Sequence, residues 1–405
     1  MKTIYNIITY IAGVLLPIPA LWNKKLRLFV EGRKEVFAYL KKHITAEGSW
    51  VWVHAASLGE FEQGLPVIQA LRGQGYKVLV TFFSPSGYEV RKNSPEVDAV
   101  CYLPLDTPAN AQQLVAIVQP KMAFFVKYEF WTNSLHALKD NGVPTYLISG
   151  IFREGQAFFK WYGGLQRACL PCFTHFFVQN TLSKSLLERL GYGNVTVSGD
   201  TRFDRVAAIA TLDNHLGFME TFKGNSLCVV FGSSWPEDEA VYLSTINEST
   251  AGTKFVIAPH NIHPENIAAL QERITKRVGR YSEKDSIDLT AIDVLILDTI
   301  GILTKVYAYA DVAYVGGGMA TGLHNVLEPA VFGVPVVIGK HYEKFAEAVD
   351  LVALGGVRSV DSEASCKEVL TALIASPEKC HSVGAINARY IAEKKGATER
   401  IMNNL

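Results

Sequence analysis

Residues 316–330 read GGGMATGLHNVLEPA, and residues 333–337 read GVPVV. We interpret this stretch as a glycine loop, a helix and a tight turn between two strands, the first over residues 312–315. Backbone without side chains lets N–H groups approach a phosphate, and a helix N-terminus adds a favourable dipole. Glu328, early in that helix, could accept hydrogen bonds from a ribose. These parts suit a nucleotide carrying a sugar. Glycines needed only for close packing of a βα turn would look the same, but the ordered string HNVLEPA with GVPVV behind it is less common by chance.

Bulk properties exclude several classes of protein. The chain has 405 residues, more than one hydrophobic core usually serves, so we expect two domains. Lys and Arg number 39, as do Asp and Glu, and there is no long basic run, so no global field recruits nucleic acid. Six cysteines in a chain of this length do not indicate a disulfide framework and suit a reducing compartment.

The N-terminus is apolar. Residues 4–22 carry no charge, and a helix of 19 residues is about 28 Å long, close to the hydrocarbon thickness of a bilayer. Lys24, Lys25 and Arg27 follow directly, which favours a cytoplasmic location for the rest of the chain. We expect residues 1–23 to be a membrane anchor that spans the bilayer or lies in its interface. An apolar helix packed on the domain is the alternative.

From residue 50 onward, short β-rich runs alternate with helical stretches, which predicts doubly wound parallel sheets. The series restarts near residue 226, so we expect two Rossmann-like domains with a cleft between them, one over residues 24–205 and one over residues 206–405. The expected strands are residues 50–54, 77–83, 97–102, 122–126, 145–149, 175–178 and 195–197 in the first half, and 226–231, 254–258, 293–297, 311–315 and 334–338 in the second.

Polar loops follow two strands of the first half, where ligands of such sheets bind. Ser57, Gly59 and Glu60 come after the first strand and open a helix. We expect the helix dipole to keep Glu60 ionised, and such a carboxylate can take a proton from an attacking hydroxyl. By spacing alone, a capping box with Ser57 at the N-cap and Glu60 at N3 is the stronger interpretation. Glu129 and Trp131 follow another strand and either bind an acceptor sugar or serve as a first-turn acid and a core aromatic.

Three further segments carry candidate anion-binding groups. Residues 199–204 read GDTRFD, in which Arg202 could meet an anionic ligand or pair with Asp204. After a strand of the second half, Gly232, Ser233 and Ser234 place hydroxyl and N–H groups before a helix, as an anion pocket or as a plain helix N-terminus. Another loop supplies Pro259, His260 and His263. A third metal ligand is not evident near those histidines, so we favour donors to a phosphate, with a surface loop as the alternative.

Missing motifs narrow the chemistry. No Gly-Lys-Ser/Thr phosphate loop occurs, which argues against an ATPase, and no Gly-x-Ser-x-Gly elbow occurs. No Asp-x-Asp occurs either. A glycosyltransferase on this chain would therefore rely on helix N-termini and basic groups to bind the diphosphate or phosphate.

Taken together, these strings resemble the family of 3-deoxy-D-manno-octulosonic acid (Kdo) transferases of Gram-negative bacteria. The resemblance covers nearly the whole chain and lies in the apolar N-terminus with residues 32–34, residues 54–60, 129–131, 199–204, 232–235 and 316–335. It implies a GT-B fold at the cytoplasmic face of the inner membrane, with CMP-Kdo as donor and a lipid A precursor as acceptor in lipopolysaccharide biosynthesis. It implies no metal or other cofactor in the transfer.

The resemblance also implies roles for single residues. Glu60 matches the catalytic base of the family, and Gly318, Asn325 and Glu328 match the block that holds the CMP end of the donor, next to Gly316 and Gly317. The family commonly has Pro-Arg-His-Pro-Glu where residues 259–265 read PHNIHPE, so we expect His260 or His263 to replace the arginine.

Our hypothesis is an inverting, metal-independent transfer of Kdo from CMP-Kdo to a lipid A precursor of the lipid IVA type, with inner-membrane lipids as a further partner and no nucleic acid. The alternatives are a UDP-sugar transferase or a sugar-nucleotide epimerase on the same fold, and a membrane-tethered sugar-nucleotide binder without catalysis. An epimerase would need neither an anchor nor a lipid acceptor.

Overall fold

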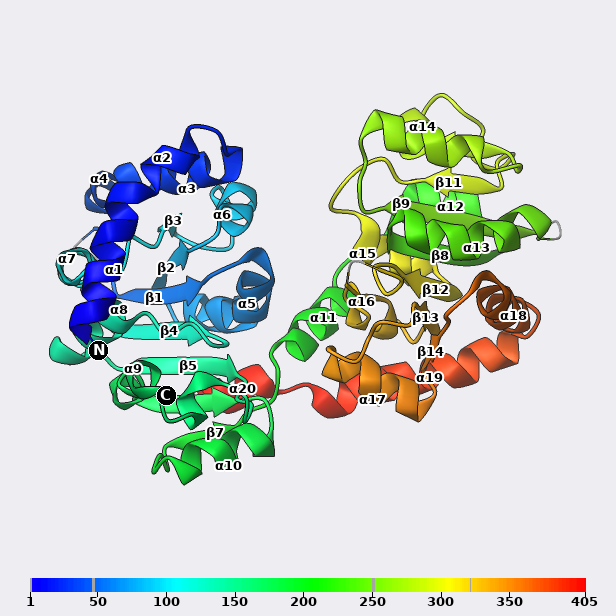
Figure 1. Ribbon diagram of the computed structural model, residues 1–405. Coiled ribbons are helices and arrows are strands. Elements are labelled where there is room, and N and C mark those ends of the chain that lie inside the picture. The colour runs from blue at the N-terminus through cyan, green and yellow to red at the C-terminus, as the bar shows by residue number, and fades with distance from the viewer. Residues whose placement is uncertain (1, 46–47, 250–251, 321) are drawn as a thin grey trace. The chain divides into compact units, whose positions relative to one another are not determined.

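The computed structural model describes residues 2–45, 48–249, 252–320 and 322–405 (Figure 1). The chain forms two compact units. The first unit comprises Met1–Arg205 with Lys394–Leu405, and the second comprises Val206–Glu393.

The first unit is built on a parallel sheet of seven strands in the order β3-β2-β1-β4-β5-β6-β7. Its strands are β1 Trp50–Ala55, β2 Lys77–Phe82, β3 Ala99–Tyr102, β4 Met122–Val126, β5 Thr145–Gly150, β6 His175–Val178 and β7 Val195–Val197. Successive side chains point to opposite faces, so Phe124 joins one core and Phe125 the other. Both faces are covered by helices, which explains why the strands read as continuous apolar runs.

The helices of the first unit divide between the two faces of its sheet. One face packs on α5 Leu58–Gly73 and α20 Ala397–Met402, and the other on α4 Val36–His43, α7 Pro108–Val118, α8 Thr132–Asp140 and α10 Thr181–Arg189. The smaller elements are α6 Pro85–Arg91, η1 Ala157–Phe159, α9 Gly164–Arg167 and η2 Leu170–Cys172.

Three helices precede α4 at the N-terminus: α1 Lys2–Leu15, α2 Pro17–Ala20 and α3 Lys24–Lys34. The stretch Lys2–Ala20 is long and apolar enough to cross a membrane, as judged by length and composition, and only 6% of it is buried. Its exposed side chains include Ile4, Ile8 and Ile11. A helix that leaves such residues in water is suited to a membrane surface or interior.

The second unit repeats the architecture with a parallel sheet in the order β10-β11-β9-β8-β12-β13-β14. Its strands are β8 Leu227–Ser234, β9 Thr253–Pro259, β10 Val278–Arg280, β11 Val294–Ile296, β12 Val312–Val315, β13 Val336–Ile338 and β14 Val357–Ser359. Its helices are α11 Arg202–Thr211, which begins in the first unit, α12 Gly217–Lys223, α13 Pro236–Glu248, α14 Pro264–Glu272, α15 Leu303–Val306, α16 Leu327–Ala330, α17 Ala346–Leu354, α18 Glu363–Ile374 and α19 Pro377–Lys394, with the short turns η3 Tyr281–Glu283 and η4 Tyr307–Tyr309.

These two parallel sheets confirm the predicted α/β, doubly wound class, and the structure differs from the expectation at particular elements. The edge strands β10 and β14 have three residues each, and Arg358 in β14 is exposed, so neither carries an apolar run that sequence inspection detects. The helix expected directly after the glycine loop is the four-residue α16, which begins only at Leu327.

The C-terminal segment belongs to the first unit, whereas we expected the second domain to run to residue 405. The carboxylate of Asp204 accepts hydrogen bonds from the backbone N–H groups of Gly396 and Thr398, at 2.5 and 2.6 Å, and from the Thr398 hydroxyl. Ile401 is fully buried in the core under α5. These contacts hold α20 on the first sheet.

Candidate active site

The first candidate site lies where the winding of the first sheet reverses. From β1 the chain proceeds to β2 on one side and later returns to β4 on the other side of β1. The loops after β1 and β4 therefore diverge at the carboxyl edge of the sheet and leave room for a ligand. Ser57, Gly59 and Glu60 are on or beside the first loop, and Glu129 and Trp131 are on the second.

Glu60 sits in the first turn of α5 and is only 8% exposed. Its Oε2 atom accepts the backbone N–H of Ser57 at 3.1 Å, so the predicted capping interaction exists. Burial raises the pKa of Glu60, and the negative charge of Glu129 raises it further, while Lys127 and His54 act in the opposite direction. Desolvation therefore acts against the helix dipole, which favours the charged form of Glu60.

A buried hydrogen-bond chain supports Glu129. The Trp131 Nε1 atom is 2.9 Å from both the Nε2 atom of His54 and the Oε2 atom of Glu129. On its other side, the His54 Nδ1 atom is 2.8 Å from the Oγ1 atom of Thr81, which also accepts the Trp52 Nε1–H group at 2.8 Å. When the Nε2 atom of His54 accepts from Trp131, the ring proton is on Nδ1, and this N–H group donates a hydrogen bond to Thr81.

His54 and Thr81 are fully buried, and our sequence reasoning did not include them among the site residues. The available signal was a histidine at the end of an otherwise apolar strand, WVWVHA. A buried polar side chain in that position needs partners, and here these partners orient the site.

Arg33 of α3 adds a half-buried cation to this region. Its guanidinium donates to the carbonyl oxygens of Phe29 and Phe83 at 2.9 and 2.8 Å, and burial lowers the pKa of Arg33 to about 9. The Phe83 ring is 4.7 Å from the Trp131 ring. The N-terminal helices thereby contact the aromatic wall of the site.

Strained backbone marks three of the strand ends. Lys127, Ser149 and Ser233 have φ angles of 64°, 50° and 55° without being glycine. Residues other than glycine rarely adopt this left-handed region, and such strain is concentrated at functional sites. All three lie at the carboxyl ends of strands, in β5 and β8 or directly after β4.

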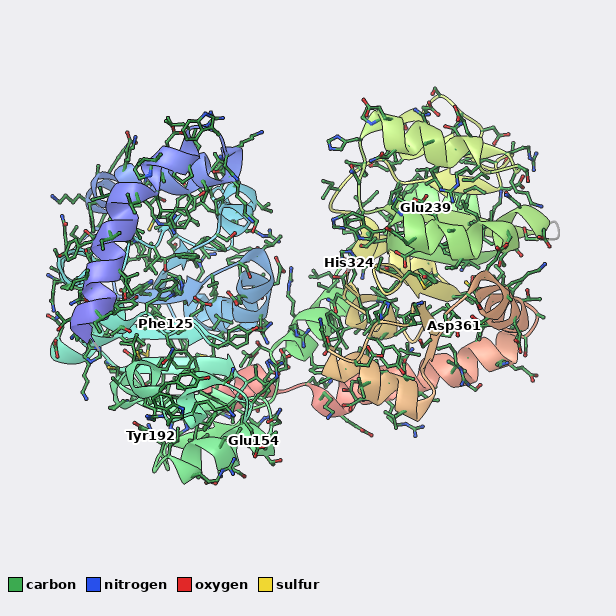
Figure 2. The ribbon with its side chains drawn as sticks, viewed as in Figure 1. Phe125, Glu154, Tyr192, Glu239, His324 and Asp361 are labelled. Carbon is green, nitrogen blue, oxygen red and sulfur yellow. The ribbon has the colours of Figure 1, made fainter. Side chains whose placement is uncertain are left out.

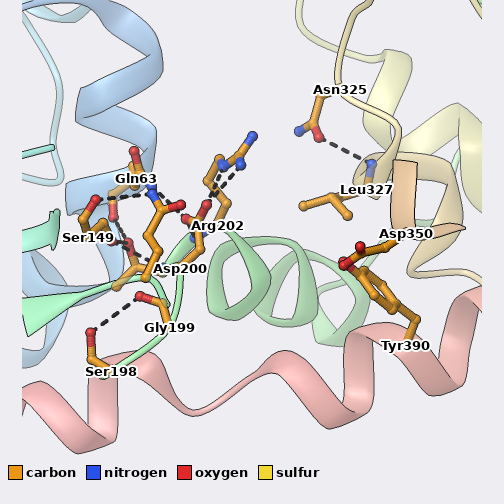
Figure 3. Close-up of polar contacts among 12 residues, drawn as sticks. Gln63, Ser149, Ser198, Gly199, Asp200, Arg202, Asn325, Leu327, Asp350 and Tyr390 are labelled. Atoms are coloured by element: carbon orange, nitrogen blue, oxygen red, sulfur yellow. Dashed lines mark hydrogen bonds and ion pairs between the residues drawn. The ribbon is translucent and has the colours of Figure 1, made fainter. Parts of the chain in front are cut away.

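Arg202 is held by Asp200 (Figure 3). The guanidinium of Arg202 lies 2.8 Å from the Asp200 Oδ2 atom, and the other oxygen of Asp200 accepts from Gln63 of α5 at 2.5 Å. Asp204, which we considered as a partner of Arg202, accepts hydrogen bonds from backbone N–H groups at the start of α20. Since Gln63 is one turn after Glu60, Arg202 supports the helix that carries Glu60.

The second candidate site lies at the equivalent reversal in the second sheet, between β8 and β12. The end of β8 supplies Gly232, Ser233 and Ser234, and the loop after β12 supplies Gly316, Gly317 and Gly318. Pro259 ends the neighbouring strand β9, with His260 after it. The strand pairing thus brings these predicted donor-site segments to one edge.

Asp238 organises the glycine loop, and sequence reasoning missed it. Its Oδ2 atom accepts the N–H groups of Gly317 and Trp235 at 2.7 and 3.0 Å, and its Oδ1 atom accepts the Tyr314 hydroxyl at 3.0 Å. The Gly317 amide, which we expected to face a phosphate, is therefore engaged inside the protein. The signal was an acid at the third position of a helix that follows Trp235-Pro236.

Two of the glycines allow close backbone packing. A side chain at Gly316 would collide with the backbone of Ser233 and Ser234, and one at Gly318 would collide with Gly339. The packing interpretation of these glycines therefore holds. These glycines contribute to a ligand site by letting neighbouring loops, which carry other polar groups, come close together.

Three aromatic side chains lie close together beyond the strands. Trp235 and His260 stack with ring centroids 4.2 Å apart, and His260 lies 4.8 Å from His324, which Figure 2 labels on the loop after β12. Burial lowers the pKa of His324, and His260 lowers it further. His260 therefore joins the predicted donor site, whereas His263 is an exposed residue at the N-cap of α14.

Glu328 and Asn325 form the last part of this site. The carboxylate oxygens of Glu328 accept from the Thr304 hydroxyl at 3.0 Å and from the Asn325 amide at 3.1 Å. The Asn325 carbonyl in turn accepts the Leu327 N–H group at 3.1 Å. Thr304 of α15 was not predicted, because it reaches Glu328 from another segment.

No group of three His, Cys, Asp or Glu side chains that could hold a metal ion occurs among the residues that the structure describes. The six cysteines are buried free thiols.

The sequence of this chain is similar to the sequences of known proteins. The family model described as 3-deoxy-D-manno-octulosonic-acid transferase (kdotransferase) matches residues 31–205. The 3-deoxy-D-manno-octulosonic acid transferase of Haemophilus influenzae is 25% identical over 384 residues, covering 88% of this chain and 86% of that protein. The transferase of the same name from Bordetella pertussis is 27% identical over 378 residues, covering 88% and 86%.

Among solved structures, the UDP-GlcNAc 2-epimerase of Neisseria meningitidis bound to UDP-GlcNAc is similar with a TM-score of 0.63 and 16% identity, over 87% of this chain and 98% of that chain. At this identity the likeness concerns the fold alone. It agrees with the predicted GT-B fold class.

Proposed function

We propose that this chain is a member of the 3-deoxy-D-manno-octulosonic acid (Kdo) transferase family and that it transfers Kdo from CMP-Kdo to a lipid A precursor in lipopolysaccharide biosynthesis. The family places the chain among the glycosyltransferases. The observation that carries the proposal is the buried Glu60 carboxylate at the reversal point of the first sheet, next to Glu129.

Glu60 acts as the general base in this proposal. A hydroxyl of the acceptor gives its proton to the Glu60 carboxylate while its oxygen bonds to the anomeric carbon of Kdo. The bond from that carbon to the phosphate of CMP breaks at the same time, so CMP leaves with the electron pair and the configuration inverts. A carboxylate with a raised pKa is a stronger base than an ordinary one and is suited to this step.

Glu129 and Trp131 orient the acceptor. The Glu129 carboxylate accepts from the Trp131 indole, which also contacts His54, and Thr81 in turn holds His54. Before the acceptor binds, the negative charge of Glu129 also favours the protonated form of Glu60. The positive charge of Lys127 opposes this effect. Nearby basic groups thus offset part of the negative charge of the two carboxylates.

The second unit binds the donor. The Glu328 carboxylate and the Asn325 amide are placed to meet the ribose, and the Ser233 hydroxyl and His260 are placed to meet the phosphate. The Trp235 and Gly317 amides already donate to Asp238, so the side chains carry more of the phosphate binding than a bare helix N-terminus would. No metal takes part in this proposal.

The apolar N-terminal segment and the basic residues after it hold the enzyme at the cytoplasmic face of the inner membrane. The exposed apolar side chains of α1 support membrane attachment. Lys24, Lys25 and Arg27 would then lie beside anionic headgroups.

One assay tests the proposal. Purified protein is incubated with CMP-Kdo and a lipid A precursor, with and without EDTA, and CMP release and product mass are followed. We expect equal CMP release in both arms and a product heavier by Kdo residues. Loss of activity with EDTA would contradict metal independence. Isomerisation of a sugar nucleotide without any acceptor would contradict the transferase and support an epimerase.

A further inference from the structure

A pocket of about 430 Å³ opens beside Glu129 in the first unit. Its lining includes Tyr5 of α1, Glu129 and Trp131 of the loop after β4, Phe158 of η1, Gln156 before η1, and Gln166 of α9. Glu129 and Trp131 belong to the site described above. Tyr5 was not part of that site, because we assigned the N-terminal helix only to membrane attachment.

Polar contacts fix α1 to the wall of this pocket. The Tyr5 hydroxyl donates to the Asp106 Oδ2 atom at 2.7 Å, and the Asn133 amide donates to the Asn6 Oδ1 atom at 2.8 Å. Asp106 is 4% exposed and also accepts the N–H groups of Asn133 and Ser134, at 2.9 and 2.8 Å. It thereby caps α8, the helix that begins directly after Trp131. One buried carboxylate therefore couples α1 to the loop that carries Glu129.

The chemistry of the lining indicates the kind of ligand. Rings such as Tyr5, Trp131 and Phe158 offer flat apolar surfaces, while Glu129 and two glutamines offer hydrogen bonds. A sugar ring has apolar C–H faces and a rim of hydroxyls, and it matches such a mixture. An acyl chain would desolvate the polar groups without satisfying them, which is costly.

The opposite face of α1 is suited to the acyl chains. Ile4, Ile8, Ile11 and Val14 are between 50% and 74% exposed on this helix. A glycolipid is amphipathic, so its sugar and its chains need adjacent polar and apolar surfaces. The helix α1 offers both surfaces: its polar side faces the pocket, and its apolar side faces away from the pocket.

We propose that α1 is part of the acceptor site: Tyr5 forms one wall of a pocket that holds a sugar ring of the glycolipid acceptor, while the exposed face of α1 contacts its acyl chains. This inference rests on the proposed function, because it names where the acceptor of that reaction binds. The helix is then required for acceptor binding even where no bilayer is present.

The test compares two tyrosines of the same helix in detergent solution. Tyr5→Ala removes the pocket wall, and Tyr10→Ala removes an equal side chain that is 52% exposed. We expect Tyr5→Ala to raise the acceptor KM about tenfold or more with the KM for CMP-Kdo unchanged, because central aromatic contacts carry much of the binding energy. With a deacylated acceptor, which has no chains to contact the exposed face of α1, we expect Tyr10→Ala to stay within about twofold of the wild type.

A second variant and a second acceptor complete the test. Gln166→Ala changes α9 and leaves the sequence of α1 intact, and it should also raise the acceptor KM, so it decides the question if Tyr5→Ala does not fold. The Tyr5→Ala defect should persist with a deacylated acceptor. A defect confined to the acylated acceptor would assign the pocket to an acyl chain and overturn the inference, as would equal behaviour of the two tyrosine variants. A wild-type protein that transfers no Kdo at all would instead refute the proposed function.

Discussion

Replacing Asp238 by alanine tests whether an internal carboxylate holds the glycine loop of the second unit. The substitution removes the partner of three donors: the Gly317 and Trp235 amides and the Tyr314 hydroxyl. Gly317 and Tyr314 are buried and cannot turn to water, whereas Trp235 is half-buried. Each buried donor left without a partner costs about 1–3 kcal/mol, so the two together predict about 2–6 kcal/mol of lost stability.

Two matched variants separate the hydrogen bonds from other effects. Asp238→Asn keeps an oxygen that accepts both amides, and its NH2 group can donate to the Tyr314 hydroxyl, so we expect a loss of about 1 kcal/mol or less. Glu237→Ala removes an exposed acid one position earlier in the helix and should change stability by about 0.5 kcal/mol at most.

The assay is urea unfolding followed by circular dichroism, with CMP binding measured by calorimetry on the same samples. Asp238→Ala should lower the unfolding midpoint and weaken CMP binding about tenfold or more, because the loop that carries Asn325 and Glu328 loses its anchor. A loss of less than about 1 kcal/mol together with unchanged CMP affinity would refute the reasoning.

Two further predictions concern the pH dependence and the packing. The negative charge of Glu129 raises the pKa of Glu60, so Glu129→Gln should lower that pKa and shift the acid limb of the kcat/KM profile to lower pH; a limb that stays in place or moves to higher pH would show that the two carboxylates do not interact. Gly316→Ala places a methyl group against the backbone of Ser233 and Ser234 and should cost about 1–3 kcal/mol in urea unfolding, whereas Gly193→Ala, with no atom within 4 Å of the added carbon, should not; equal stabilities would contradict the packing role of Gly316.

The fold could be predicted from the sequence wherever the burial of side chains produces an apolar run. Central strands such as β1 and β4 are covered on both faces and therefore appear as apolar runs. The edge strands β10 and β14 lack such runs and were missed. The return of α20 to the first unit depends on Asp204 meeting backbone groups about 190 residues away, which no local pattern encodes.

The candidate site was readable in part for the same reason. Loops after strands were identified from local spacing, and the strand pairing brings the predicted residues of each unit to one edge. Partners that come from distant segments were not identified: Asp238 bonds to Gly317, 79 residues away, and His54 to Trp131, 77 residues away. The effect of burial on the pKa of Glu60 was not foreseen, because burial is a property of the folded chain.

The most direct test of the central claim is the turnover of Glu60→Gln with CMP-Kdo and a lipid A precursor, with CMP affinity measured on the same protein. Glutamine preserves the size of the side chain but cannot take a proton, so the account predicts unchanged CMP binding and a kcat about a hundredfold to ten-thousandfold lower. A folded Glu60→Gln protein that transfers Kdo at nearly the wild-type rate would contradict it.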